Sequence, residues 1–150
     1  MTSTVPTTDE TEIRELLTAL EPAMREGDAE RVVARYSPDA VKFDLAPPLR
    51  LSGAEVTDAE GLRKWFAEKG GSVDYRVTDL VVTAGADIAY AHSLNRMADP
   101  APDGSPRFEL WFRATYCLRK RDGRWLITHE HNSTPFYMDG SFAAALDLRP

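Results

Sequence analysis

Polar, ionisable side chains gather in a strand-like run late in the chain, where an apolar pattern would be expected. His129, Glu130, His131 and Asn132 follow one another within residues 124–133. Burying such a group without a hydrogen-bond partner costs about 2–7 kcal/mol, so each needs a partner if this run lies inside the protein. Two of the chain's three histidines are here. The run is therefore the first place to search for a functional site.

The spacing of His129 and His131 places both side chains on the same face of a strand. Such pairs occur in metal sites, where further ligands come from other segments. Nothing near these two histidines in the sequence completes a ligand set. We therefore expect them to satisfy neighbouring groups or to support a subunit contact. We expect neither a metal nor a cofactor.

A second candidate for chemistry is Asp44, which follows Phe43 in a strand-like run and precedes Leu45-Ala46-Pro47-Pro48. Apolar neighbours raise the pKa of a carboxyl group. A raised pKa would suit Asp44 to general acid–base catalysis. The alternative is an aspartate that caps the backbone before the prolines, and the sequence leaves both interpretations open.

Length and the pattern at the N-terminus indicate how the chain is divided. A length of 150 residues is typical of one domain with an ordinary core. Residues 1–8 are polar, so we expect a flexible tail there and a single domain over residues 9–150. The starting segment MTSTVPTTDETE has no apolar core, so we do not expect a secretory signal.

Composition excludes several classes of protein. A net charge of -6 with dispersed arginines argues against nucleic-acid binding, which favours a basic face. No apolar run approaches the roughly 20 residues of a membrane helix. The one cysteine, Cys117, fits a reducing cytoplasm. The arginine- and alanine-rich usage is typical of a GC-rich bacterial genome. We expect a cytoplasmic bacterial protein.

The elements that would position these residues follow an α+β order. Apolar spacing predicts helices near residues 9–26, 28–37 and 57–70, and a short terminal helix at 141–147. Strands are expected at residues 40–45, 73–83, 88–97, 108–120 and 124–133. Helices followed by an antiparallel meander can bury their apolar stripes only on one face of the sheet. A curved sheet around helices leaves an open mouth for a small molecule, and the long 98–106 loop could act as its lid.

Two sequence blocks resemble a known family. They are GDAERVVARYSPDAVKFDLAPPLRLSG and ATYCLRKRDGRWLITHEHNSTPF. The chain resembles the NTF2-like superfamily, in its SnoaL-like and ketosteroid-isomerase-like branch. The second block also resembles the association domain of calmodulin-dependent kinase II. The resemblance implies a cone in which a curved antiparallel sheet wraps around N-terminal helices, with a pocket between them.

The isomerase resemblance implies a reaction. The proton-shuttling carboxylate of those enzymes matches Asp44. Their first oxyanion donor, a tyrosine, matches Leu20, and the second donor matches Tyr116 most closely. The resemblance therefore implies cofactor-independent proton abstraction next to a carbonyl, of isomerase, cyclase or dehydratase type, on a small apolar or polyketide-like substrate. Classical steroid isomerisation is not expected. The alternative is a non-catalytic ligand-binding or assembly module of the same fold.

The association-domain resemblance implies which side chains face the pocket. Its pocket positions match His92, Tyr116 and Asn132, and strand alternation adds Glu130. A buried hydrogen-bond network that specifies the fold is the alternative role for these side chains. The predicted catalytic residues are Asp44, Tyr116 and His92, and the predicted substrate-binding residues are Asn132, Glu130, Trp65 and Phe66.

The same alternation assigns the opposite face of the last strand. It places Trp125, Ile127, His129 and His131 there, beside Trp111 of the preceding strand. Trp111, Trp125 and Ile127 together form a large apolar surface to leave in water. We therefore expect a homodimer that forms through the outer face of the sheet.

Overall fold

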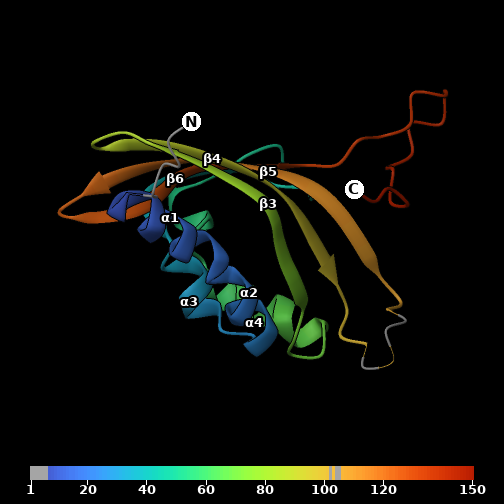
Figure 1. Ribbon diagram of the computed structural model, residues 1–150. Coiled ribbons are helices and arrows are strands. Elements are labelled where there is room, and N and C mark those ends of the chain that lie inside the picture. Colours follow the sequence, from blue (N-terminus) through green and yellow to red (C-terminus); the bar gives the residue numbers. More distant parts are fainter. Residues whose placement is uncertain (1–6, 102, 104–105) are drawn as a thin grey trace.

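A curved sheet lies over a layer of helices in the computed structural model of the protein (Figure 1). The structure describes residues 7–101, 103 and 106–150. The sheet has six strands in the order β2-β1-β6-β5-β4-β3. The predicted α+β class is confirmed. Of the predicted 98–106 lid, residues 102, 104 and 105 lie outside the described residues.

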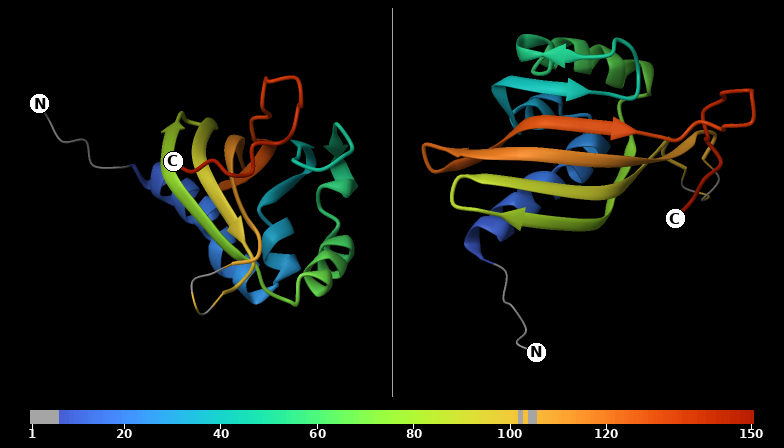
Figure 2. Two further views of the ribbon diagram at one scale, coloured as in Figure 1. Left: turned by 90° about the vertical axis from the view of Figure 1, so that its right-hand side faces the viewer. Right: turned by 90° about the horizontal axis from the view of Figure 1, so that it is seen from above.

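The elements follow the expected order along the chain. The helices are α1 (Thr8–Thr18), α2 (Leu20–Glu26), α3 (Ala29–Val33), η1 (Gly53–Glu55, a 3-10 helix) and α4 (Ala59–Glu68). The strands are β1 (Tyr36–Phe43), β2 (Leu51–Ser52), β3 (Asp74–Ala84), β4 (Ile88–Ala98), β5 (Glu109–Arg121) and β6 (Arg124–Ser133). The helices lie against one face of the sheet in both further views (Figure 2). Among the described residues, no helix combines the length and hydropathy that a membrane crossing requires.

The first helix begins earlier than the sequence pattern predicts. Thr7 caps α1 by accepting a hydrogen bond from the backbone N–H of Glu10 at 3.1 Å. A threonine in this position satisfies one of the free N–H groups of the first turn. Thr7 and Thr8 therefore belong to the folded domain rather than to the predicted tail at 1–8, and residues 1–6 lie outside the described residues.

Gly27 ends α2 at a place where only glycine fits. Its φ of 64° is in the left-handed region. A Cβ atom at this position would lie 2.4 Å from the carbonyl oxygen of Gly71. The close approach joins the end of α2 to the turn that leads from α4 into β3. It therefore holds α2 and α4 at the end of the fold where the cavity lies.

One pairing in the sheet differs from the predicted antiparallel pattern. β1 runs parallel to β6, with Val41 opposite His129 and Phe43 opposite His131. The remaining pairings are antiparallel. Because β1 and β6 run in the same direction, both strands end at the same edge. This edge brings Asp44 beside Asn132, although 88 residues separate them along the chain.

A β-bulge in β6 overturns part of the predicted face assignment. Thr128 has no cross-strand partner between the β5–β6 pairs on either side of it. The extra residue restarts the alternation of side chains. Trp125 and Ile127 therefore lie in the core, with relative exposures of 5% and 0%, on the same face as Glu130 and Asn132. The prediction that Trp125 and Ile127 lie on the outer face is wrong.

Two groups of buried side chains join the helices to the sheet. The first lies under α1 and includes Ile13, Leu17, Ala91, Leu118 and Ile127. The second lies under α2 and α4 and includes Leu20, Met24, Phe66, Tyr75 and Phe112. The candidate cavity borders the second group.

The chain after β6 forms a small hairpin instead of the predicted helix at 141–147. Residues 135–146, which we call the arm, are closed by an antiparallel bridge between Phe136 and Ala144. Figures 1 and 2 show the arm standing away from the sheet, on the side opposite the helices. After the arm, Arg149 returns to form an ion pair with Glu109 at the start of β5.

Candidate functional site

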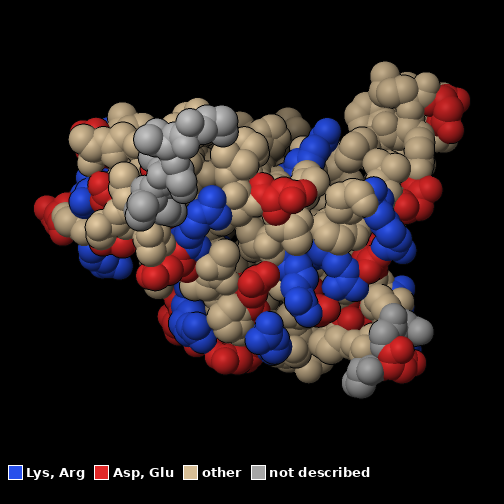
Figure 3. All heavy atoms as spheres, in the orientation of Figure 1, with Lys and Arg blue, Asp and Glu red and all other residues tan. Residues whose placement is uncertain are grey.

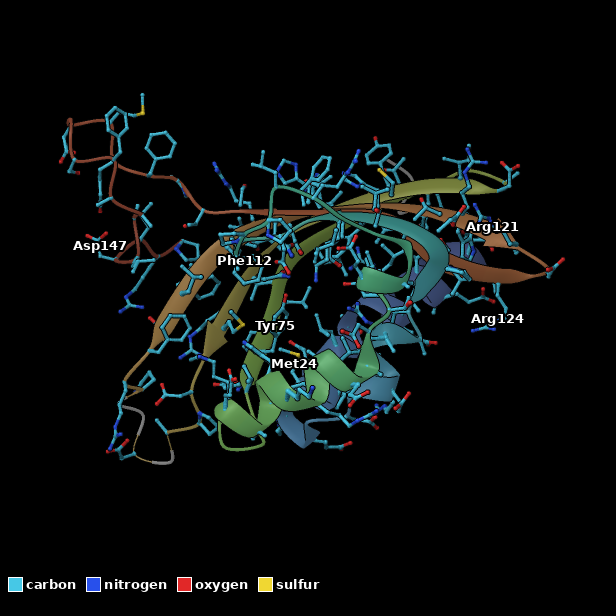
Figure 4. The ribbon with its side chains drawn as sticks, turned by 180° about the vertical axis from the view of Figure 1, so that it is seen from behind. Met24, Tyr75, Phe112, Arg121, Arg124 and Asp147 are labelled. Carbon is cyan, nitrogen blue, oxygen red and sulfur yellow. The ribbon has the colours of Figure 1, made fainter. Side chains whose placement is uncertain are left out.

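A cavity of 330 Å³ lies between the helices and the concave face of the sheet. Figure 4 shows three of its lining side chains, Met24, Tyr75 and Phe112, on the inner side of the sheet and the facing helix. One part of the wall is apolar and includes Leu20, Val32, Leu62, Trp65 and Met97. The other part is polar and consists of Arg35, Tyr36, Lys42, Asp44, Tyr75, Glu130 and Asn132. Such a division suits a small molecule with an apolar body and a polar end.

Glu130 is the buried centre of the polar wall, with a relative exposure of 4%. The Tyr36 hydroxyl donates to Oε1 at 2.8 Å, and the Asn132 amide donates to Oε2 at 2.9 Å. Lys42 Nζ lies 3.5 Å from Oε2. Burial alone would raise the pKa of Glu130, but Lys42, Arg35 and these hydrogen bonds lower it. Glu130 is thus an ionised, fully partnered anchor, with little capacity to accept a substrate proton.

Asp44 is held by three groups but keeps contact with open space. Its Oδ1 accepts hydrogen bonds from the Leu45 backbone N–H at 2.8 Å and the Asn132 amide at 3.3 Å. Its Oδ2 lies 3.3 Å from Lys42 Nζ, and its side chain is 33% exposed. Burial favours a higher pKa for Asp44, but Lys42, Leu45 and Asn132 outweigh it, so the pKa is lowered. The raised pKa expected from the sequence is wrong, because Lys42, two residues earlier in the chain, places its Nζ beside the carboxylate.

Both sequence interpretations of Asp44 describe part of what it does. The bond to Leu45 is the backbone cap that the sequence offered as one alternative. The carboxylate also lines the cavity, as the other alternative requires. Since Glu130 is enclosed by partners, Asp44 is the more accessible of the two cavity carboxylates.

Arg35 is a cavity residue that the sequence did not indicate. It is 3% exposed, its Nε donates to the Val32 carbonyl at 3.2 Å, and its Nη2 lies 3.5 Å from the Tyr36 hydroxyl. Its Nη1 has no hydrogen-bond partner among the described residues. Burial opposes the charge, but Tyr36 and Glu130 raise the pKa of Arg35, so it stays a cation. A buried charged donor without a partner has a high desolvation cost and strongly favours an acceptor.

A tyrosine pair lies next to Arg35 at the sheet side of the cavity. The Asn95 amide donates to the hydroxyls of Tyr75 and Tyr116, at 2.9 and 3.0 Å. Asn95 in turn accepts from Ser93 at 2.7 Å. Burial raises the pKa of Tyr116 to about 12. Both tyrosines therefore stay protonated at neutral pH, and each hydroxyl keeps its hydrogen available to donate.

Three of the predicted site residues lie elsewhere. Tyr116 is 1% exposed and packs in the core beside Asn95, and Tyr75 takes the cavity-lining position. His92 is exposed on the outer face opposite Thr115, because its neighbours Ala91 and Ser93 point inward. The prediction that His92 faces the pocket is wrong, because the residues on either side of it take the inward-facing positions of β4.

Phe66 is the third such residue, since it is buried in the core at 3% exposure and does not line the cavity. Its neighbour Trp65 does line it, as predicted. In total, the structure brings Asp44, Glu130, Asn132 and Trp65 together at one cavity.

His129 and His131 lie outside the cavity. His129 Nδ1 lies 2.8 Å from the Val41 carbonyl, and its ring packs edge-on against Phe43. His131 also packs against Phe43. These contacts support the pairing of β1 with β6. Over residues 7–101, 103 and 106–150, no group of three or more His, Cys, Asp or Glu side chains is arranged to hold a metal ion.

The fold and its cavity define the NTF2-like class. A family model of the SnoaL-like domain matches residues 13–137, and the chain therefore belongs to the SnoaL-like domain family. A solved NTF2-like protein of unknown function from Pseudomonas putida is similar over 98% of this chain and 100% of its own, with 33% identity and a TM-score of 0.83. No curated protein matches the sequence.

More distant structures share the fold alone. An NTF2-like protein with a cystatin-like fold from Novosphingobium aromaticivorans has 20% identity and a TM-score of 0.67, over 94% of this chain and 90% of its own. The association domain of the C. elegans kinase CaMKII has 19% identity and a TM-score of 0.63, over 84% of this chain and 95% of its own. The predicted superfamily, including its likeness to the kinase association domain, is thus confirmed.

Proposed function

We propose that the protein is a cofactor-independent enzyme that moves a proton at the carbon next to a carbonyl group. Its substrate is a small molecule with an apolar body and one carbonyl at its polar end. The apolar wall around Trp65 and Phe112 holds the body. The carbonyl oxygen faces Arg35 and Tyr75, and the adjacent C–H faces Asp44.

The proposed step balances within these residues. Asp44 takes the proton as the C–H bond breaks, and the electron pair moves to the carbonyl oxygen as an enolate forms. Arg35 and Tyr75 donate hydrogen bonds to that oxygen, which replaces the oxyanion role predicted for Tyr116. Preorganised donors in a water-poor site are worth several kcal/mol to such a transition state. Asp44 then returns the proton to a carbon of the enolate as the carbonyl reforms, which gives an isomerase when that carbon differs from the first. In a lyase of the dehydratase type, the enolate instead expels a hydroxyl group from the neighbouring carbon, and the proton held by Asp44 leaves with it as water.

The observation that carries this proposal is the unpartnered Nη1 of Arg35. A buried cation that lines a cavity and has spare donors favours an oxygen acceptor on the ligand. The charges of the polar wall already balance, since Arg35 and Lys42 offset Asp44 and Glu130. A neutral carbonyl therefore fits better than a carboxylate, which would add an uncompensated negative charge.

The proposal can be tested without knowing the natural substrate. In heavy water, abstraction and return of a proton exchanges hydrogen for deuterium next to the carbonyl, which NMR detects across a panel of small ketones and enones. Asp44→Asn should reduce exchange by at least about 100-fold, the scale of general base catalysis. Asn can still accept from the Leu45 N–H, so the fold should persist.

Asp122→Asn is the matched control for this experiment. It makes the same chemical change in the exposed turn between β5 and β6, at a positive φ of 52° that asparagine tolerates. This control should keep full exchange. Exchange by Asp44→Asn at the wild-type rate would overturn the mechanism.

A second candidate function is a binding module with the same cavity and no chemistry. The observation in its favour is the Lys42–Asp44 ion pair, which lowers the pKa of Asp44 and so weakens it as a base. This candidate predicts that a ligand of the panel binds but is recovered without deuterium. Native mass spectrometry of the complex together with NMR of the released ligand separates the two functions.

A further inference from the structure

The arm exposes apolar side chains that a monomer would leave in water. Met138, Phe142, Leu146 and Phe136 have relative exposures of 81%, 65%, 54% and 49%. Figure 3 shows the arm as a mostly uncharged projection with acidic groups at its surface. A contiguous exposed apolar patch marks an interaction surface.

The arm is nevertheless an ordered unit with its own bonds. Tyr137 N–H donates to the Ala143 carbonyl, and Ala145 N–H donates to the Pro135 carbonyl, both at 2.8 Å. The rings of Phe136 and Phe142 lie 5.7 Å apart. In the part of the chain that the structure describes, the hydrogen bonds of residues 135–147 stay within that segment. An isolated hairpin is marginally stable in water, so this one requires a surface to pack on.

A surface of matching chemistry lies at the same end of the sheet. An open cleft of 970 Å³ is lined by residues 43–50 and His131. Its side chains are mainly apolar, and Leu49 is 96% exposed. Arg50 and His131 are its basic groups, and the carboxylate in its lining, Asp44, is already paired with Lys42. Asp139 and Asp147 are the acidic groups of the arm and the segment that follows it. The arm and the cleft therefore match in apolar character, and the acidic groups of the arm suit the basic groups of the cleft.

The arm of a given copy is directed away from the cleft of that same copy. Beyond the arm, Leu148 and Arg149 line a groove with Leu94 and Trp111, on β4 and β5. The ion pair of Arg149 with Glu109 holds the chain end there. The cleft belongs to β1, which lies on the other side of β6 in the sheet order. The cleft is thus open to a second copy.

We propose that the arm of one copy docks into the cleft of a second copy, and that the exchange is reciprocal. In a two-fold contact, the same surface must carry both the inserted part and the receiving part. Here the arm and the cleft both begin at the paired ends of β1 and β6, where Phe43 lies opposite His131. This interface differs from the outer-face dimer expected from the sequence, since the core holds two of the three side chains on which that expectation rested.

The interface also reaches the candidate site. Asp44, Leu45 and Ala46 line both the cleft and the cavity, so they form the wall between them. A docked arm packs on the outside of this wall. The second copy therefore supports the segment that positions the Asp44 carboxylate.

The oligomeric state of the full-length chain tests this proposal. Native mass spectrometry and light scattering at micromolar concentration should show a dimer for the wild type. The double variant Met138→Asp/Phe142→Asp changes the arm, and Leu49→Asp changes the cleft, and each should be monomeric. Ile88→Asp is the matched control, because it changes a 53% exposed apolar side chain at the opposite end of the sheet, and it should remain dimeric.

A mixing experiment distinguishes arm exchange from any other dimer. The arm variant keeps an intact cleft, and the cleft variant keeps an intact arm, so the mixture restores one of the two contacts. A heterodimer should form where neither variant alone dimerises. Circular dichroism confirms that each variant is folded. A monomeric wild type, a dimeric arm variant or a mixture without heterodimer would overturn the proposal.

Discussion

Four ionised side chains lie close together in the polar wall of the cavity, and their charges balance. Lys42 contacts both carboxylates, at 3.3 Å for Asp44 and 3.5 Å for Glu130. Arg35 adds a second cation, whose hydrogen bonds go to the Val32 carbonyl and the Tyr36 hydroxyl. The sum of the four charges is neutral, and among the described residues the Nη1 of Arg35 is a buried donor without a hydrogen-bond partner. The polar wall therefore favours a ligand that accepts a hydrogen bond without bringing a charge.

Glu130 links the cavity to the pH dependence of folding. Its pKa in the folded state lies below the ordinary value of 4.5. The stabilisation it gives is complete above that ordinary value and is lost as the pH falls through the folded-state pKa. Glu130→Gln should therefore flatten the fall in the free energy of unfolding on acidification. At neutral pH it should cost about 3–5 kcal/mol, because Lys42 loses a buried counter-charge.

Urea unfolding at a series of pH values measures this effect. Glu68→Gln, at the exposed end of α4, is the control and should leave the acid dependence as in the wild type. If the Glu130 variant unfolds with the wild-type pH dependence, its ionised state does not stabilise the fold.

A substitution of Lys42 tests whether Asp44 acts as a base. Replacing Lys42 with Met removes the cation that lowers the pKa of Asp44 most strongly. If Asp44 is the base, the acid limb of the pH profile for deuterium exchange should move to higher pH. A purely structural Lys42 would change the amount of folded protein and leave the position of the limb unchanged.

At the level of elements, the close approach of α2 to the α4–β3 turn positions the cavity. Gly27→Ala should lower the free energy of unfolding by more than about 2 kcal/mol. The left-handed backbone costs roughly 1–2 kcal/mol for a residue with a Cβ, and the contact with Gly71 adds to that. Denaturant unfolding provides the measurement.

Gly70→Ala isolates the first of these costs, that of the left-handed backbone. Gly70 also has a positive φ, of 78°, but a Cβ there would meet nothing within 4 Å. Its variant should show the backbone cost alone. Equal losses for the two variants would mean that the approach to Gly71 contributes nothing.

The elements themselves were largely predictable, because helical and alternating patterns are local properties of the sequence. The positions of individual side chains were less so. Thr128 shows why: nothing in its type marks a bulge, yet it sets the faces of Trp125 and Ile127. Arg35 was missed for a similar reason, since its burial depends on Tyr36 and Glu130, and Glu130 is distant in the sequence. The Asp44–Asn132 contact agrees with the prediction because both residues fell in the blocks that carried the family resemblance.

At the scale of the whole molecule, the two proposals meet at the wall formed by residues 44–46. If the arm supports this wall, a ligand in the cavity and a second copy in the cleft should bind cooperatively. Linkage requires the effect to be reciprocal. A ligand from the carbonyl panel should lower the dimer dissociation constant, and the monomeric arm variant should bind that ligand more weakly than the dimer does. Because a dimer has two cavities, the dimer dissociation constant at saturating ligand should fall by the square of the difference in affinity per cavity.

Calorimetric titration and sedimentation at several ligand concentrations measure both sides of this cycle. Ile88→Asp again provides the control and should keep the wild-type coupling. Equal ligand affinity in monomer and dimer would show that the wall is rigid without the arm, while leaving the dimer itself intact.

The bulge at Thr128 has an evolutionary consequence. It divides one strand into two stretches whose side chains are under different constraints. Trp125 and Ile127 are constrained by the packing of α1 and the sheet, whereas Glu130 and Asn132 are constrained by what enters the cavity. Selection for a new substrate can change the second stretch while the first keeps the protein folded. A single strand can therefore conserve the scaffold and diversify the chemistry at the same time.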